Sequence, residues 1–203
     1  MRNILLALAA FAAVTLAGAQ ARADTITFVG GFGTTGTVSN YTLTGNTFTF
    51  TVTNTSSAGN ITAIGFDLTG DRQNNFQLVG PTNGFTIAQD VAVQAGAVTT
   101  AGVNKGVFDF ALLTGSNFGN GAGSGGIAPG QSATFTITGD FTNMTAQQIA
   151  EAISLRFKGI GPNDESTVAE PNPVPEPMTM LLLGTGLAGV AAKVRRRGRR
   201  EKV

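Results

Sequence analysis

The chain of 203 residues contains no Cys, His or Trp and has a formal net charge of +1. Without Cys the fold cannot depend on disulfides, and without His or Cys the Ser–His and Cys–His forms of nucleophilic catalysis are excluded. Most basic residues lie near the two ends, so the segment from Asp24 to Glu170 has ten acidic and four basic side chains, a balance of −6. This balance argues against a nucleic-acid binder, which needs a basic face.

The first 23 residues have the composition of a secretion signal. Arg2 supplies the positive start, residues 4–16 are apolar, and Ala21-Arg22-Ala23 is the small-x-small pattern that a signal peptidase accepts. The alternative is a membrane anchor, but the apolar run is shorter than the ~20 residues that a span needs. We therefore expect cleavage between Ala23 and Asp24, followed by export.

Period-two alternation dominates the chain from Asp24 to Thr142. It is clearest in residues 46–53, where Phe48, Phe50 and Val52 face one way and four threonines face the other. Similar alternation predicts further strands at residues 25–29, 38–43, 61–68, 85–87, 107–112 and 134–138. Residues 45–53 and 130–138 have similar patterns, which we attribute to similar packing constraints on two strands.

A short helix interrupts the strands. Residues 143–153 place Ile149, Ala152 and Ile153 at helical spacing after an Asn or Thr cap. A last strand is predicted at residues 155–160, and the segment containing Asp164 and Glu165 is predicted to be a polar linker. The sequence thus predicts one mainly β domain over residues 24–170, an antiparallel two-sheet β-sandwich with one helix. A jelly roll or a small barrel are the alternatives.

The C-terminal part has three successive segments. Residues 171–177 contain a proline at every second position, which predicts a stiff, extended spacer. Residues 178–194 are largely apolar, and a helix over them would rise ~25 Å, short of the ~30 Å hydrocarbon core, so it is a marginal transmembrane helix. The basic tail, residues 195–203, is expected to stay cytoplasmic and to stop transfer. Its stop-transfer residues are Arg195, Arg196, Arg197, Arg199 and Arg200.

Pro175-Glu176-Pro177, the apolar segment and the arginine cluster, in this order at the C-terminus, resemble the PEP-CTERM sorting domain over about residues 174–200. The resemblance implies a Gram-negative bacterium that makes exopolysaccharide, and recognition by exosortase, a membrane protease that processes the chain near the Pro-Glu-Pro motif. The middle domain also resembles, in its general sequence pattern, the ectodomains carried by such proteins and cohesin-like or carbohydrate-binding sandwiches.

Few polar residues form a pattern typical of a metal-binding or cofactor-binding site. Asp67 and Asp71 with Asn74 or Asn75 have the oxygen ligands of a calcium site, but their spacing matches no motif, so we expect solvated turn residues and no metal. Asp109, between two phenylalanines, is expected to face solvent. Residues 121–126 and 184–189 fit G-x-G-x-x-G, but neither stretch opens a helix after a strand, so no cofactor is expected.

We therefore expect no enzyme and no cofactor, but an exported protein of the cell surface or exopolysaccharide matrix with a structural or adhesive role in a biofilm. Signal peptidase and exosortase would process it, and it would pass transiently through the inner membrane. A carbohydrate-binding module is the alternative, with Tyr41 as the only polar aromatic side chain, and an extracellular hydrolase that uses carboxylates alone is a further one.

Overall fold

A computed structural model describes residues 25–70, 75–92, 107–118 and 125–172. In chain order its elements are β1 (Thr25–Val29), the 3-10 turn η1 (Gly31–Gly33), β2 (Thr35–Thr44), β3 (Thr47–Asn54), β4 (Asn60–Phe66), β5 (Gln77–Val79), β6 (Thr86–Ala92), β7 (Val107–Leu113), β8 (Ser132–Thr138), helix α2 (Ala146–Glu151), β9 (Ile153–Ile160) and β10 (Glu165–Pro171).

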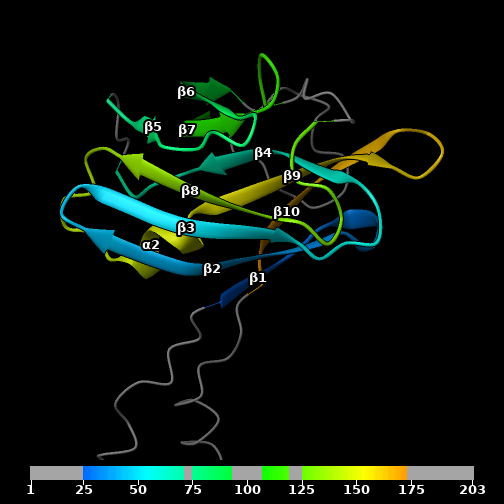
Figure 1. The fold of residues 1–203 in the computed structure, drawn as a ribbon, viewed down its shortest axis with the longest axis horizontal. Coiled ribbons are helices and arrows are strands. Elements are labelled where there is room, and N and C mark those ends of the chain that lie inside the picture. Colours follow the sequence, from blue (N-terminus) through cyan, green and yellow to red (C-terminus); the bar gives the residue numbers. More distant parts are fainter. Residues whose placement is uncertain (1–24, 71–74, 93–106, 119–124, 173–203) are drawn as a thin grey trace, which may run out of the picture. The chain divides into compact units, whose positions relative to one another are not determined.

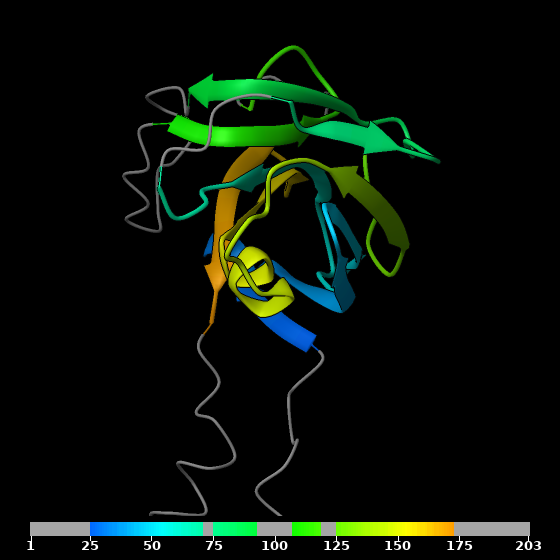
Figure 2. The same ribbon diagram turned by 90° about the vertical axis from the view of Figure 1, so that its left-hand side faces the viewer.

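The strands form one antiparallel sheet in the order β5-β8-β3-β2-β1-β10-β9-β4-β7-β6. The sheet curls until its edge strands β5 and β6 come into contact, so it is nearly closed into a barrel (Figures 1 and 2). The mainly β, antiparallel prediction is confirmed, whereas the two-sheet sandwich is not. The difference arises at β1 and β10, where Phe28 pairs with Pro171 and Val29 with Glu170, which joins the two halves.

The predicted strands are present, and β1 has its predicted bounds. Two strands were not predicted, the short β5 and the C-terminal β10. The second of these runs from Glu165 to Pro171, so the interpretation of Glu165 as part of a linker is wrong, and the strand reaches into the segment predicted as a spacer. The strand was not recognised because its polar residues interrupt the apolar alternation. The structure accommodates these residues through hydrogen bonds: Thr167 accepts one from the Gly31 amide, and Glu170 accepts one from the Ser154 hydroxyl.

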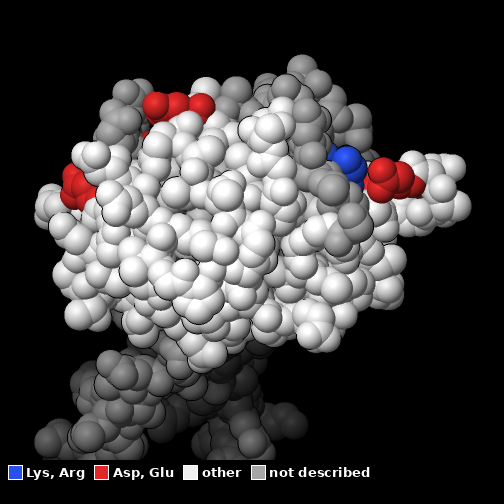
Figure 3. All heavy atoms as spheres, turned by 45° about the horizontal axis from the view of Figure 1, so that its top comes forward, with Lys and Arg blue, Asp and Glu red and all other residues white. Residues whose placement is uncertain are grey.

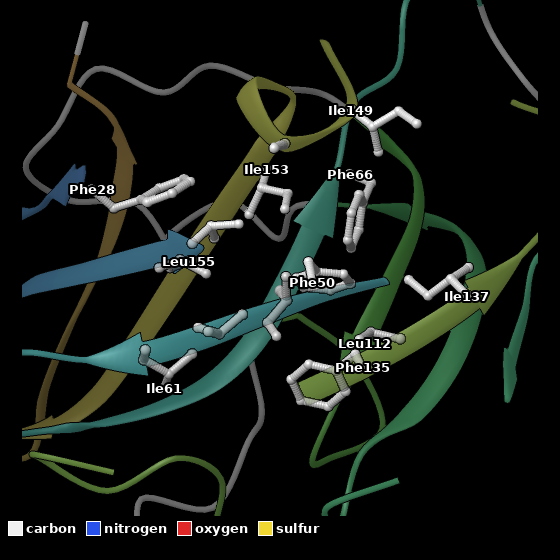
Figure 4. Packing of buried hydrophobic residues seen from close by; sticks show 14 of the residues in the cluster. Phe28, Phe50, Ile61, Phe66, Leu112, Phe135, Ile137, Ile149, Ile153 and Leu155 are labelled. Atoms are coloured by element: carbon white, nitrogen blue, oxygen red, sulfur yellow. The ribbon is translucent and has the colours of Figure 1, made fainter. Parts of the chain in front are cut away.

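The main core fills the inside of the curved sheet. Phe48, Phe50 and Val52, the residues predicted to face inward from β3, are all fully buried there. Figure 4 shows side chains from distant strands meeting around Phe50, among them Phe66 and Phe135. The domain has no disulfide to stabilise it, so this aromatic packing supplies much of the driving force for folding.

Helix α2 lies at one end of the ring of strands (Figure 2). Its Ile149 and Ala150 are buried in the main core, as the helical spacing predicted for Ile149. The cap is Thr145, whose hydroxyl accepts from the Gln148 amide while the Gln148 side chain accepts from the Thr145 amide. This capping box satisfies two backbone amides at the start of the helix and so determines where the helix begins.

A second, smaller cluster lies on the opposite face of the sheet from the main core, over β4, β6, β7 and β10. Its members are Ala63, Val91, Phe108, Ala111, Leu113, Phe118 and Val168. The ring of Phe108 lies so close to Gly65 that a Cβ on that glycine would come within 2.7 Å of it. Both faces of β4 and β7 are therefore covered, which is why these strands are buried almost throughout.

Candidate functional site

The residues predicted to direct processing lie outside the described residues. These are the cleavage residues Ala21, Ala23 and Asp24, the motif Pro175, Glu176 and Pro177, and Arg195, Arg196, Arg197, Arg199 and Arg200. The predicted transmembrane helix over residues 178–194 also lies outside them, and none of the helices that the structure does describe is long and apolar enough to span a membrane. The amide of Asn172, the last described residue, donates to the Thr27 carbonyl at 2.7 Å, so the end of the domain is held against its first strand.

The calcium candidates are only partly described. Asp67 is exposed directly after β4, and Asn75 has a left-handed backbone with φ of 81°, while Asp71 and Asn74 lie outside the described residues. Within the described ranges, no group of three or more Asp, Glu, His or Cys side chains could hold a metal ion. The glycine-rich stretch 121–126 lies mostly outside those ranges, and residues 184–189 lie wholly outside them.

The prediction that Asp109 faces solvent is wrong. Asp109 is only 8% exposed, and its Oδ2 accepts a hydrogen bond of 2.6 Å from the Leu68 amide. Simple alternation fails here because both faces of β7 are covered: Phe110 and Leu112 pack in the main core, and Ala111 and Leu113 pack in the second cluster. Asp109 therefore has a structural role, since it satisfies a backbone amide near the end of β4.

Arg156 on β9 is a second buried charged residue, which the sequence did not single out. It is 3% exposed, and burial lowers the pKa of its guanidinium because desolvation disfavours the charged form. Its Nη2 donates to the Ser166 hydroxyl at 3.2 Å, and nearby Ser154 donates to Glu170 at 2.7 Å. These bonds join β9 to β10 and so help to hold the C-terminal hairpin in the sheet.

The most regular polar surface is the outer face of β2, β3 and β8, here called the threonine face. It comprises Thr35, Thr37, Ser39, Thr42, Thr44, Thr47, Thr49, Thr51, Thr53, Ser132, Thr134, Thr136 and Thr138. The register sets these hydroxyls in rows across the strands: Thr49, for example, pairs with Thr42 on one side and Thr136 on the other. The three strands, described along their whole length, contain no charged residue.

Neighbouring hydroxyls on this face bond to each other. The oxygen–oxygen distances are 3.2 Å for Thr49 and Thr136, 2.9 Å for Thr51 and Thr134, and 2.8 Å for Thr53 and Ser132. A hydroxyl has one donor and two acceptor positions, so each bonded pair still offers a donor and several acceptors to solvent or to a ligand. The face is therefore an ordered array of hydrogen-bonding groups.

A β-bulge in β2 extends the array. The register shifts between Ser39 and Thr42, and Asn40 has a left-handed backbone with φ of 51°. The extra residue restores the outward direction of Thr42 and Thr44, and it lets Leu43 pack against the main core. Tyr41, in the bulge, is half-buried and also packs against that core.

The sequence pattern predicted the outward threonines of β3 but not the face as a whole. The similarity between residues 45–53 and 130–138 was the available signal, and it has a direct structural meaning. The two segments contain β3 and β8, which lie side by side with Thr47 opposite Thr138 and Phe50 opposite Phe135. The repeated pattern thus places matching hydroxyls and matching apolar residues next to each other.

Residues 173–197 match the family model of the PEP-CTERM protein-sorting motif. The chain carries a PEP-CTERM sorting motif. The matched range agrees with the resemblance predicted from Pro175-Glu176-Pro177 and the segments after it. No curated protein and no solved structure matches the chain. The PEP-CTERM motif is a signal for export, transient membrane anchoring and sorting by exosortase to a surface or extracellular location.

Proposed function

We propose that this PEP-CTERM protein is a structural or adhesive component of the cell surface or exopolysaccharide matrix, and not an enzyme. The sorting motif at residues 173–197 is the observation that carries the proposal, because it directs the domain to that location. The chain has no His or Cys for nucleophilic catalysis, and the threonine face offers a broad uncharged surface for adhesion.

In this proposal, proteolytic processing, and not the hydrophobic helix, determines the final location of the protein. The segment 178–194 is too short for a permanent anchor in a ~30 Å core, and the arginine cluster after it is costly to translocate. Transfer therefore stops with the Pro-Glu-Pro motif near the outer boundary of the inner membrane. Exosortase cleaves there, and the domain, which begins at Asp24 after signal peptidase has acted, reaches the surface or matrix.

The test compares the wild type with a variant in which Pro175, Glu176 and Pro177 are replaced by Ala, each expressed in an exosortase-containing host. We expect the wild type to yield a mature form in the surface and matrix fraction, starting at Asp24 by N-terminal sequencing. The Ala variant is expected to stay unprocessed in the inner membrane. If the variant matures and reaches the same fraction as the wild type, the sorting step is refuted. If the mature wild type is entirely free in the medium, the matrix role is refuted.

A further inference from the structure

We infer that the threonine face binds a neutral polysaccharide, whose hydroxyl groups exchange hydrogen bonds with the threonine and serine hydroxyls of β2, β3 and β8. The inference rests on the proposed function, because it names the partner that an adhesive matrix protein would hold. The cellular location of the protein does not determine which of its surfaces binds a partner, whereas this inference assigns the binding to the threonine face.

The charge distribution selects a neutral partner. Strands β2, β3 and β8 contain no Lys, Arg, Asp or Glu, and in Figure 3 the charged side chains lie at the margins of a broad uncharged surface. Phosphate-bearing polymers and anionic lipid surfaces are bound through Lys and Arg, and metal ions through carboxylates. The threonine face offers neither kind of group, so its complement is an uncharged molecule rich in hydroxyls.

The side-chain composition argues against a second copy of the chain as the partner. The centres of protein interfaces are enriched in aromatic residues, Met and Arg, which supply most of the binding energy. On β3 the apolar side chains Phe48, Phe50 and Val52 point into the core and are fully buried, so only threonines point outward. The exposed groups are suited to hydrogen bonding and not to burial of a large apolar area.

The hydroxyls are held in place before any ligand arrives. Thr is stiff at χ1, and the bonds between Thr51 and Thr134 and between Thr53 and Ser132 restrict the hydroxyls further. Groups that are already ordered lose little entropy on binding. The strands lie about 4.8 Å apart, and side chains on one face repeat at about 6.7 Å along each strand, so several sugar residues of one chain meet hydroxyls together.

The twist of the sheet favours a flexible polymer over a rigid, flat surface. Adjacent strands of a sheet rotate by about 20–25° relative to one another, so three strands do not present a plane. A polysaccharide chain follows such a surface by rotating its glycosidic bonds. Because Tyr41 is half-buried against the main core, hydrogen bonds and not aromatic stacking provide most contacts, and we expect affinity to increase with chain length.

The test uses the mature protein purified from the surface fraction. The probes are exopolysaccharide from the producing cells, separated by ion exchange into neutral and anionic fractions, and dextran as an unrelated neutral glucan; binding is measured by affinity electrophoresis. The main variant changes Thr49, Thr51, Thr134 and Thr136 to Val. It replaces both members of two hydrogen-bonded pairs with side chains of similar shape, which is nearly neutral for stability. A control variant, Thr69→Val with Thr86→Val, alters threonines outside the face.

We expect the wild type and the control to bind the neutral fraction, and the fourfold variant to bind it at least about tenfold more weakly, since several hydrogen bonds are lost. A Thr→Ser variant at the same four positions keeps the hydroxyls and is expected to bind. If the fourfold Val variant does not unfold cooperatively, the single variants Thr51→Val and Thr134→Val take its place, each expected to weaken binding about 2- to 10-fold.

Equal binding by the wild type and the Val variants would overturn the inference. So would equal or tighter binding of the anionic fraction, or binding of none of the probes by a protein that is correctly sorted; in these cases the proposed surface location still stands. A dimer that is lost in the Val variant, measured by sedimentation, would show instead that the face joins two copies. Failure of the proposed function is seen separately, as absence of the mature protein from the surface and matrix fraction.

Discussion

Phe50 lies at the centre of the main core and shows the packing at the scale of a single residue. It has no exposed surface, and its ring centroid is 5.1 Å from that of Phe48 and 5.6 Å from those of Phe66 and Phe135. Phe48 lies on the same strand, β3, whereas Phe66 comes from β4 and Phe135 from β8, so rings from three strands meet here. Loss of the Phe50 ring therefore leaves a cavity that no single neighbour can fill.

We predict that Phe50→Ala lowers the free energy of unfolding by about 3–5 kcal/mol, the usual range for a buried phenylalanine. Phe50→Asp is expected to be worse, because it adds an unpaired buried charge. Phe32→Ala is the matched control: Phe32 is 52% exposed, and its removal should change stability by less than about 0.5 kcal/mol. Urea unfolding measures all three, and equal losses for Phe50→Ala and Phe32→Ala would contradict the packing described.

Asp109 leads to a different kind of prediction, because its side chain contributes a hydrogen bond and not apolar packing. Asp109→Ala removes the acceptor for the Leu68 amide and should cost about 1–3 kcal/mol. Asp109→Asn keeps an oxygen acceptor of the same shape and should cost less. Thermal unfolding of the two variants provides the comparison. If Asn is as damaging as Ala, the hydrogen bond to Leu68 is not what makes Asp109 important.

At the scale of an element, the bulge in β2 is the feature on which the threonine face depends. Asn40 adopts φ of 51°, which Asn and Gly tolerate but β-branched residues do not. We predict that Asn40→Val destabilises the domain by about 1–2 kcal/mol, whereas Asn40→Gly has little effect. The measurement is chemical denaturation of both variants. Similar stability of the Val and Gly variants would mean that the bulge does not require a left-handed residue.

At the scale of the whole molecule, β10 joins the two halves of the sheet. It lies between β1 and β9, and Asn172 adds a hydrogen bond to Thr27 just after it. Without β10, the half that ends in β1 and the half that ends in β9 would each have an unpaired edge. The sheet is therefore continuous only when β10 is present.

We predict that a chain of residues 24–172 folds alone, with a circular dichroism spectrum dominated by β structure and cooperative unfolding. A chain that ends at residue 160 lacks β10 and should show no cooperative transition, because the sheet is then interrupted between β1 and β9 and both of these strands are left with an unpaired edge. The full-length mature protein serves as the reference. Cooperative unfolding of the shorter chain would show that β10 is an addition to a domain that is already complete.

Local patterns in the sequence determined part of this protein's structure and role. Period-two alternation predicted most strands and placed Phe48 and Phe50 in the core, since alternation on a strand depends only on neighbours in the sequence. Ile149 at helical spacing predicted the helix. The Pro-Glu-Pro motif, apolar segment and arginine cluster predicted the sorting signal, because a sorting enzyme recognises a short linear segment.

Only the tertiary structure decided how the strands join and which polar residues are buried. The pairing of Phe28 with Pro171 turned an expected sandwich into one continuous sheet, and the second cluster around Phe108 covered Asp109, which alternation had placed in solvent. The threonine face likewise depends on contacts such as Thr49 with Thr136, which are 87 residues apart. Each of these features needs segments that are distant in the chain to meet, and their position relative to one another is set by packing of the whole domain and not by local preference.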